Sequence, residues 1–169
     1  MDEPNKQNFN HLKIHSQYSI CEGAIKIDEL REYAKENKIK ALALCDSENL
    51  CGALEFAEKL SKIGTQPVIG SQINFKMNDT IGLLPLFALN EIGYKRLIEL
   101  SSLSYLKNDN LSDPHLMVEE LLNETEGLAI FSGTVNGLFG KLFNNGKFSE
   151  IQEIYKKLKL KYESRFYIE

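Results

Sequence analysis

The chain has 169 residues, of which 43% are hydrophobic and 26% charged, and its formal net charge is −4. This composition is that of an ordinary globular domain with one sizeable core, which excludes a disordered chain and argues against a phosphate-gripping basic domain. No run approaches the roughly 18 apolar residues that span a bilayer, and the polar, acidic start is unlike a secretory signal. We therefore expect a cytoplasmic protein without membrane contact, with its three cysteines as free thiols.

The first half of the chain alternates strand and helix patterns. Residues 11–15 predict a short strand, on which alternation would place His11, Lys13 and His15 on the same face. The apolar run that ends at Asp46 predicts a strand buried on both faces. In chain order, the predicted elements are a strand at 11–15, a helix at 27–38, a strand at 39–46, a helix at 49–64, and strands at 67–75 and 81–89.

The second half continues the alternation. The predicted elements are helices at 90–106 and 112–124, a strand at 127–133, a helix at 148–163 and a strand at 165–169. The lysine-rich stretch at 155–165 lies on a helical pattern and predicts a solvated face rather than a nucleic-acid contact. Strands that alternate with helices predict an α/β fold with a mainly parallel sheet, in which 67–75 and 81–89 can pair as a hairpin.

Polar side chains follow several of the predicted strands directly. His15, Asp46, Gln72 and the segment 132–134 all lie at or just beyond strand ends. In parallel α/β folds, functional groups collect at the carboxyl ends of strands, so these residues can meet in one pocket. Taken singly, each residue has an equally ordinary structural role in satisfying the backbone at a strand end. His115 matches no ligand motif, and we expect it at the surface.

Four separate stretches stand out, in this order: HLKIHSQYSICEGA at 11–24, ALALCDSENLCGALEFAEKLSKIGTQPVIGSQINF at 41–75, LFALNEIGYKRLIELSSLSYL at 86–106 and EGLAIFSGTVNGL at 126–138. Together they resemble the PHP domain (polymerase and histidinol phosphatase domain) found at the N-terminus of bacterial replicative DNA polymerase III alpha subunits. The resemblance covers almost the whole chain, from about residue 8 to residue 169. The segment NEIGY at 90–94, followed by LIELSSLSYL, favours the polymerase members over free-standing PHP phosphoesterases.

The resemblance implies a distorted (β/α)7 barrel. Because only five or six strands are present and the last ends at residue 169, a closed barrel would need further sequence. We therefore expect residues 1–169 to be the N-terminal part of a PHP domain, incomplete as a barrel, within a longer polymerase. An unpaired strand edge would make such a piece marginal in isolation.

In active PHP domains that this chain resembles, two or three divalent metals are held by motifs that are altered here. The His-x-His motif falls on Lys13 and His15, with His11 at the neighbouring strand position, and the Asp-His motif falls on Asp46 and Ser47. Only one residue of each pair is kept. The five substituted ligand positions are Lys13, Ser47, Gln72, Leu83 and Thr134.

Lys13 is the decisive substitution. Gln72, Ser47 and Thr134 still carry oxygen atoms, but these are weaker ligands for a transition metal than imidazole or carboxylate. An ammonium cannot coordinate, and two unit charges about 4 Å apart repel by roughly 4 kcal/mol at an effective dielectric of about 20. We therefore expect no metal at this site, and a polar network in which Lys13 pairs with Asp46 beside His15.

The resemblance implies a non-catalytic segment of a DNA polymerase. Its role would be structural, as a docking surface for the separate proofreading exonuclease subunit and near other replisome subunits. Magnesium and DNA would be bound by downstream polymerase domains. The alternatives are an active metal-dependent PHP phosphoesterase or 3'-5' exonuclease, which would use His11, His15 and Asp46, and a free-standing binding domain unrelated to a polymerase.

Overall fold

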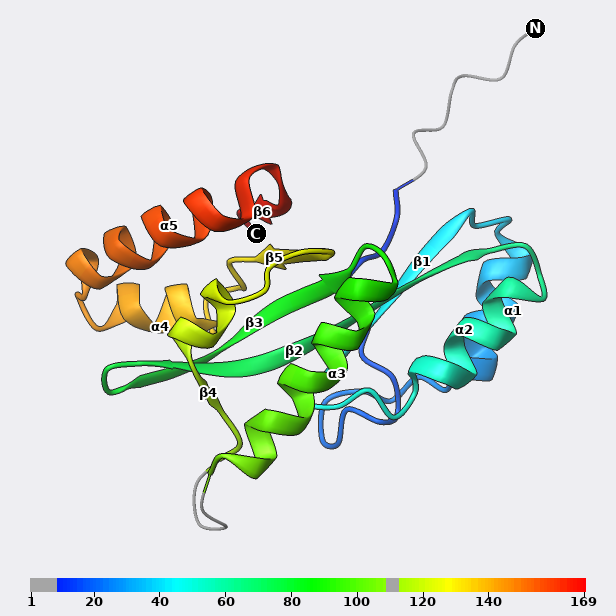
Figure 1. Ribbon diagram of the computed structural model, residues 1–169. Helices are drawn as coiled ribbons and strands as arrows, with labels where there is room; N and C mark the ends of the chain where they lie inside the picture. Colours follow the sequence, from blue (N-terminus) through cyan, green and yellow to red (C-terminus); the bar gives the residue numbers. More distant parts are fainter. Residues whose placement is uncertain (1–8, 109–112) are drawn as a thin grey trace, which may run out of the picture.

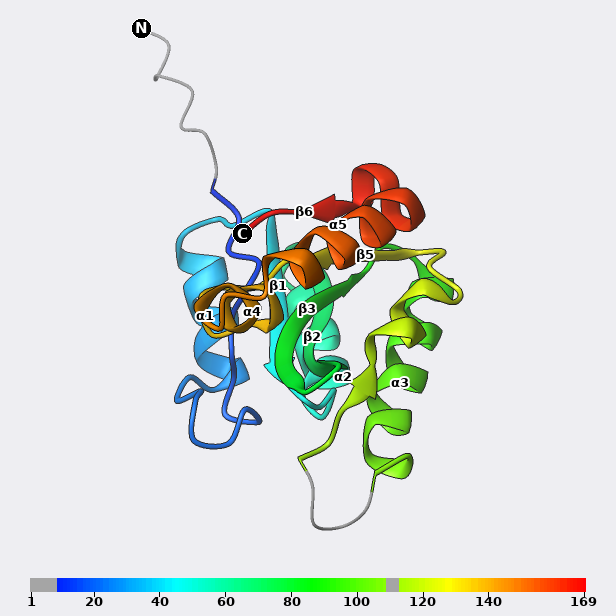
Figure 2. The same cartoon turned by 90° about the vertical axis from the view of Figure 1, so that its left-hand side faces the viewer.

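The computed structural model describes residues 9–108 and 113–169. These residues form an α/β fold in which helices surround a curved, six-stranded sheet (Figures 1 and 2), as the sequence predicts. The strands are β1 (Ala41–Ser47), β2 (Gln66–Met77), β3 (Thr80–Ala88), β4 (Leu116–Met117), β5 (Leu128–Phe131) and β6 (Phe166–Tyr167). The helices are α1 (Ile27–Glu36), α2 (Ala53–Ser61), α3 (Glu91–Leu106), α4 (Leu138–Asn144) and α5 (Phe148–Tyr162), with 3-10 turns η1 (Val118–Leu122) and η2 (Glu163–Arg165).

The sheet is mixed rather than mainly parallel. Its order is β1-β2-β3-β5-β6, and β4 pairs with the part of β2 beyond the end of β1. The pairs of β1 with β2 and of β5 with β6 are parallel, whereas β3 runs antiparallel to both of its neighbours. The predicted hairpin causes this difference, because it reverses the chain between β2 and β3 without a helical crossover.

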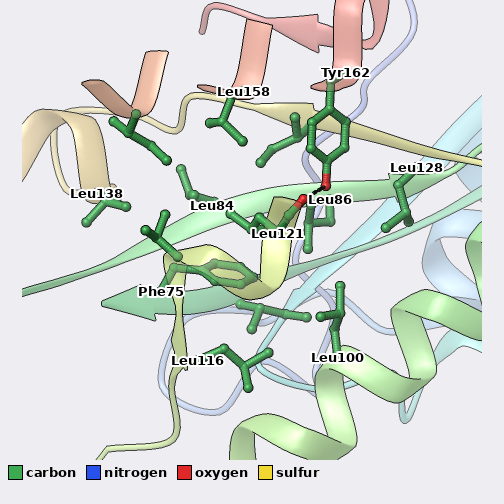
Figure 3. Close-up of a cluster of buried hydrophobic side chains, with 14 of the residues drawn as sticks. Phe75, Leu84, Leu86, Leu100, Leu116, Leu121, Leu128, Leu138, Leu158 and Tyr162 are labelled. Atoms are coloured by element: carbon green, nitrogen blue, oxygen red, sulfur yellow. Dashed lines mark hydrogen bonds between the residues drawn. The ribbon is translucent and has the colours of Figure 1, made fainter. Parts of the chain in front are cut away.

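Strand alternation divides the sheet into two faces. Leu42 and Leu44 of β1 pack with α1 and α2 in one buried cluster. A larger cluster joins the same face of β2, β3 and β5 to α3, α4 and α5, and Figure 3 shows its centre, where the Tyr162 hydroxyl donates to the Leu121 carbonyl at 2.9 Å. The opposite, concave face carries a small core of Ala43, Cys45, Phe87 and Ala129. This concave face leads to the predicted site.

Two predicted elements are wrong. Residues 11–15 run beside β1 but are not a regular strand, because the His11 and Ile14 carbonyls accept from the amides of Ala43 and Cys45. The two accepting residues are three positions apart in the segment, whereas the two donating residues are two positions apart in β1. This mismatch breaks the hydrogen-bond register of a regular ladder. The described part of the predicted helix at 112–124 forms β4 and η1 instead, and the short helix α4 was not expected.

Within the part of the chain that the structure describes, no helix has the length and apolar character needed to cross a membrane.

Candidate functional site

A polar cavity of about 400 Å³ opens on the concave face, at the end of the sheet where β1 finishes. Five elements of structure contribute to it: the N-terminal segment, the turn before α1, β2, β3 and the loop after β5. The lining residues are Lys13, His15, Glu22, Gln72, Leu83, Thr134, Asn136 and Gly137. Of the residues that the sequence analysis expected in one pocket, His15, Gln72 and Thr134 line this cavity and Asp46 does not; Leu83 also lines it.

A chain of hydrogen bonds runs along one wall of this cavity. The Gln72 amide nitrogen lies 3.3 Å from His15 Nε2 and donates to Ser47 Oγ at 3.2 Å. Ser47 Oγ in turn donates to the Glu22 carboxylate at 2.5 Å. The other ring nitrogen of His15, Nδ1, is buried and has no hydrogen-bond partner among the described residues. Three of the predicted positions are thus linked to one another by protein groups.

Asp46 is close to the cavity but does not line it. Alternation along β1 turns Ser47 toward the concave face and Asp46 away from it. The buried Asp46 carboxylate accepts from the Ser16 amide at 2.6 Å, the Ser16 hydroxyl at 2.8 Å and the Ser19 hydroxyl at 2.6 Å. Its charge is satisfied by charge-assisted hydrogen bonds from this turn, without a cation.

The predicted pairing of Lys13 with Asp46 is therefore wrong. The Lys13 ammonium instead lies 3.1 Å from the carboxylate of Glu169, at the far end of the chain. The expected network of Lys13, Asp46 and His15 is divided into three parts: Lys13 with Glu169, Asp46 with the serines of the turn, and His15 with Gln72.

His11 and His115 lie outside this cavity. The exposed His11 ring contacts Phe9 edge to face, with 4.9 Å between the ring centroids, and is not part of the lining. His115 is half-buried, and its Nδ1 lies 2.8 Å from the carbonyl of Asp113 just before β4.

Glu22 and Asn136 were missed by the sequence-based prediction. Both lie on connections, Glu22 in the turn before α1 and Asn136 in the loop between β5 and α4. Neither position carries a motif or a periodic signal, because its place in the cavity depends on how the connection folds back over the sheet.

The residues at this site do not fit the metal centre that the family resemblance implies. In the described residues, no three side chains of His, Cys, Asp or Glu are grouped so as to hold a metal ion. Lys13 lines the cavity, and both oxygens of Asp46 already accept from serines. Burial beneath the site raises the pKa of the Cys45 thiol, which keeps it protonated and poor as a ligand.

Comparisons with known proteins identify the family of this chain. The model of the PHP domain family matches residues 11–169. DNA polymerase III subunit alpha of Caulobacter vibrioides is 35% identical over 182 residues, which cover 100% of this chain and 16% of that protein. The same subunit of Rickettsia felis is 37% identical over 162 residues, covering 95% of this chain and 13% of that protein.

One solved structure illustrates a more distant likeness. An amidohydrolase from Chromobacterium violaceum is 15% identical and has a TM-score of 0.42, with 87% of this chain and 54% of that chain covered. The chain spans only about one-seventh of the length of the polymerase subunits that it resembles. Since the family model matches residues 11–169, which is nearly the whole chain, this chain belongs to the PHP domain family.

Proposed function

We propose that this chain is the N-terminal PHP-domain segment of a DNA polymerase III alpha subunit, and that the segment itself is not catalytic. Its role is structural, and it docks the proofreading exonuclease subunit of the replisome. The identity of 30–37% to DNA polymerase III alpha subunits supports the first part. The docking role rests on the family resemblance alone.

The observation that carries the non-catalytic assignment is that the polar groups at the cavity are already bound to other protein groups. A PHP hydrolase needs carboxylates and imidazoles that are free to bind metal. Here Lys13 brings a positive charge to a ligand position, and the Asp46 carboxylate is saturated by Ser16 and Ser19. The Gln72 amide nitrogen contacts His15 Nε2 and donates to Ser47 Oγ, and Ser47 Oγ donates to Glu22.

The cofactors and partners follow from the same proposal. This segment holds no metal, while magnesium and DNA are bound by polymerase domains of the longer polypeptide. Other replisome subunits assemble around that polypeptide, and its compartment is the cytoplasm.

Elemental analysis tests the proposed absence of a metal centre, on which the non-catalytic assignment depends. The chain is incubated with Zn²⁺ and Mn²⁺, desalted, and compared with His15→Ala and with His115→Ala, a control outside the cavity and outside the ligand motifs. We expect metal far below one ion per chain in all three proteins. Near-stoichiometric metal that is lost in His15→Ala and kept in His115→Ala would overturn the metal-free assignment and favour the active phosphoesterase instead.

A binding titration tests the docking role. The full chain is titrated with the purified exonuclease subunit of the same organism, with and without chelator. We expect saturable binding that is unchanged by the chelator and by His15→Ala, because docking does not use the cavity. Deleting the domain from the longer polymerase should weaken exonuclease binding. Unchanged affinity after the deletion, or no binding by a chain shown to be folded by circular dichroism, would contradict the proposal.

A further inference from the structure

Cationic side chains gather at one end of the molecule, although the net charge of the chain is −4. Residues 31–40 and 58–63 form the second halves of α1 and α2 together with the start of the connections that follow them. They hold six cationic and three acidic side chains: Arg31, Lys35, Lys38, Lys40, Lys59 and Lys62 against Glu32, Glu36 and Glu58. A net charge averages over the whole surface, so it does not exclude a positive field at this end.

Four of these cations line a groove of about 340 Å³ between α1 and α2, which we call the basic groove. The connections that follow the two helices are joined beside it, because Thr65 Oγ1 donates to the Ile39 carbonyl at 2.8 Å. The exposed Lys38 and Lys40 lie on the first of these connections. Figure 1 shows α1 and α2 side by side, on the opposite side of the molecule from α5. The lining residues are Arg31, Glu32, Lys35, Lys59, Lys62 and Ile63.

Two of the groove cations are neutralised by neighbouring carboxylates. Lys59 Nζ lies 2.7 Å from both Asp28 Oδ1 and Glu55 Oε1. The Arg31 guanidinium is paired with Glu32. These two cations therefore shape the groove but offer little charge to a ligand.

The remaining cations face solvent. Lys62 Nζ is 3.9 Å from Glu58 Oε2, and both side chains are largely exposed, so this pair is weak. Within residues 9–108 and 113–169, the ammonium groups of Lys35, Lys38 and Lys40 form no ion pair. A helix C-terminus favours a cation in its last turn, which accounts for Lys35, whereas Lys40 lies beyond α1. Four ammonium groups are thus available to an outside anion.

We propose that the basic groove, with Lys38 and Lys40 beside it, contacts the phosphate backbone of duplex DNA without reading its sequence. Lysine ammonium groups act as point charges toward phosphate, and such contacts position a protein on DNA without base recognition. Capture of an acidic peptide ordinarily adds large apolar anchors, and Ile63 is the single apolar residue of the lining.

The basic groove and the polar cavity lie at opposite ends of the strands. Ala41 and Gln66, the first residues of β1 and β2, pair beside the basic groove, whereas the polar cavity opens where β1 finishes. A DNA contact at the basic groove therefore uses neither a metal nor the cavity. It goes beyond the proposed function and stands whether or not the exonuclease docks on this domain.

A salt-dependent titration tests the DNA contact. A fluorescently labelled duplex of about 20 base pairs is titrated with the full chain, and anisotropy is measured at several NaCl concentrations between about 25 and 150 mM. We expect weak binding whose log affinity falls with log salt at a slope of about −3 to −4, since each of the four ammonium groups contributes about −0.9. The double variant Lys35→Gln with Lys62→Gln should bind about tenfold more weakly at the lowest salt, and its slope should be smaller by about two.

The matched control lies in the other lysine-rich stretch. Lys156→Gln with Lys161→Gln on α5 removes the same number of charges from exposed positions and should leave the affinity and the slope unchanged. Far-UV circular dichroism checks that both double variants are folded, as expected for exposed substitutions.

Several outcomes would overturn the DNA contact. These are equal losses in the two double variants, which would show that only net charge matters, a loss in the α5 variant alone, or no binding by the unmodified chain at the lowest salt. A poly-glutamate peptide that binds when the duplex does not would assign the basic groove to an acidic peptide instead. Metal content and exonuclease affinity do not enter these readouts, so failure here is distinguishable from failure of the proposed function.

Discussion

At the scale of single residues, Asp46 shows how protein groups satisfy a buried carboxylate at a position that the family resemblance assigns to a metal ligand. Its buried carboxylate accepts three hydrogen bonds from one turn, all between 2.6 and 2.8 Å. Asp46→Ala would leave the Ser16 amide and both serine hydroxyls without their acceptor. We expect a loss of about 3 kcal/mol in the free energy of unfolding, against about 1 kcal/mol for Ser19→Ala.

Urea unfolding of the two variants measures this difference. The unmodified chain should unfold at the same urea concentration with and without EDTA, because protein groups and not a metal satisfy Asp46. A chelator-dependent midpoint, or equal losses for Asp46→Ala and Ser19→Ala, would count against this account.

The raised pKa of Glu48 should make the free energy of unfolding depend on pH. It follows β1 with a left-handed φ of 60°, and its carboxylate accepts from the Asn74 side chain. Burial raises the pKa of Glu48 above its ordinary value of 4.5, although the Asn74 hydrogen bond opposes the shift. The folded chain therefore binds this proton more tightly than the unfolded chain, and stability falls as pH rises through the window just above 4.5.

Replacing Glu48 by glutamine should remove the loss of stability that accompanies ionisation of its carboxyl group. Relative to the unmodified chain, Glu48→Gln should gain stability between about pH 4 and pH 7, as measured by urea unfolding at several pH values. Glu91→Gln is the control with the opposite sign, because the hydrogen bond from Lys95 lowers the pKa of Glu91. A pH-independent difference for Glu48→Gln would show that its carboxyl titrates alike in both states.

At the scale of elements, the first turn of α3 packs unusually close to the turn before β5. The Asn90 side chain accepts from the Gly93 amide at 3.0 Å, and a Cβ at Gly93 would lie 1.8 Å from the Gly127 carbonyl oxygen. Gly→Ala in a helix ordinarily gains about 1 kcal/mol, but here the backbone of Gly127 would have to move. We expect Gly93→Ala to lose about 3 kcal/mol by urea unfolding, reversing the ordinary sign.

The control for this prediction lies on the same helix. Ser102 is exposed, and Ser102→Ala should change stability by less than about 0.5 kcal/mol. Stabilisation by Gly93→Ala would mean that α3 does not approach this turn so closely.

Elements with an uninterrupted pattern were predictable, and short ones were not. The buried run of β1 and the apolar stripe of α5 both appear where the sequence places them. The buried residues Leu116, Val118 and Leu121 are spaced by two and then three positions, which suits a two-residue strand followed by a 3-10 turn, not an α-helix. The pairing of β4 with β2 determines that this segment forms a strand and a 3-10 turn. The sequence of the segment alone does not predict that pairing.

At the scale of the whole molecule, the sequence predicted much of the cavity lining but not the ion-pair partner of Lys13. The sequence analysis expected His15, Asp46, Gln72 and residues 132–134 to meet in one pocket. His15, Gln72 and Thr134 line the cavity, whereas Asp46 is turned to Ser16 and Ser19. The partner of Lys13 depends on how far the sheet curls before the chain reaches residue 169. That curvature is a collective property of twist, hairpin and helix packing, to which no single motif corresponds.

We expect the two main hydrophobic clusters to unfold together in one cooperative transition, because both pack on β2. One cluster covers α1 and α2 and the other covers α3, α4 and α5, yet β2 pairs with both β1 and β3, and Ile69 packs against both clusters. Leu42→Ala in the first cluster and Leu84→Ala in the second should each cost about 2–5 kcal/mol, since both side chains are fully buried. Because β2 cannot remain ordered when either neighbouring cluster is lost, both variants should keep a single transition, with coincident midpoints by far-UV circular dichroism and tyrosine fluorescence. Two separated transitions in Leu42→Ala would instead show that α1, α2 and β1 unfold independently of the rest of the sheet.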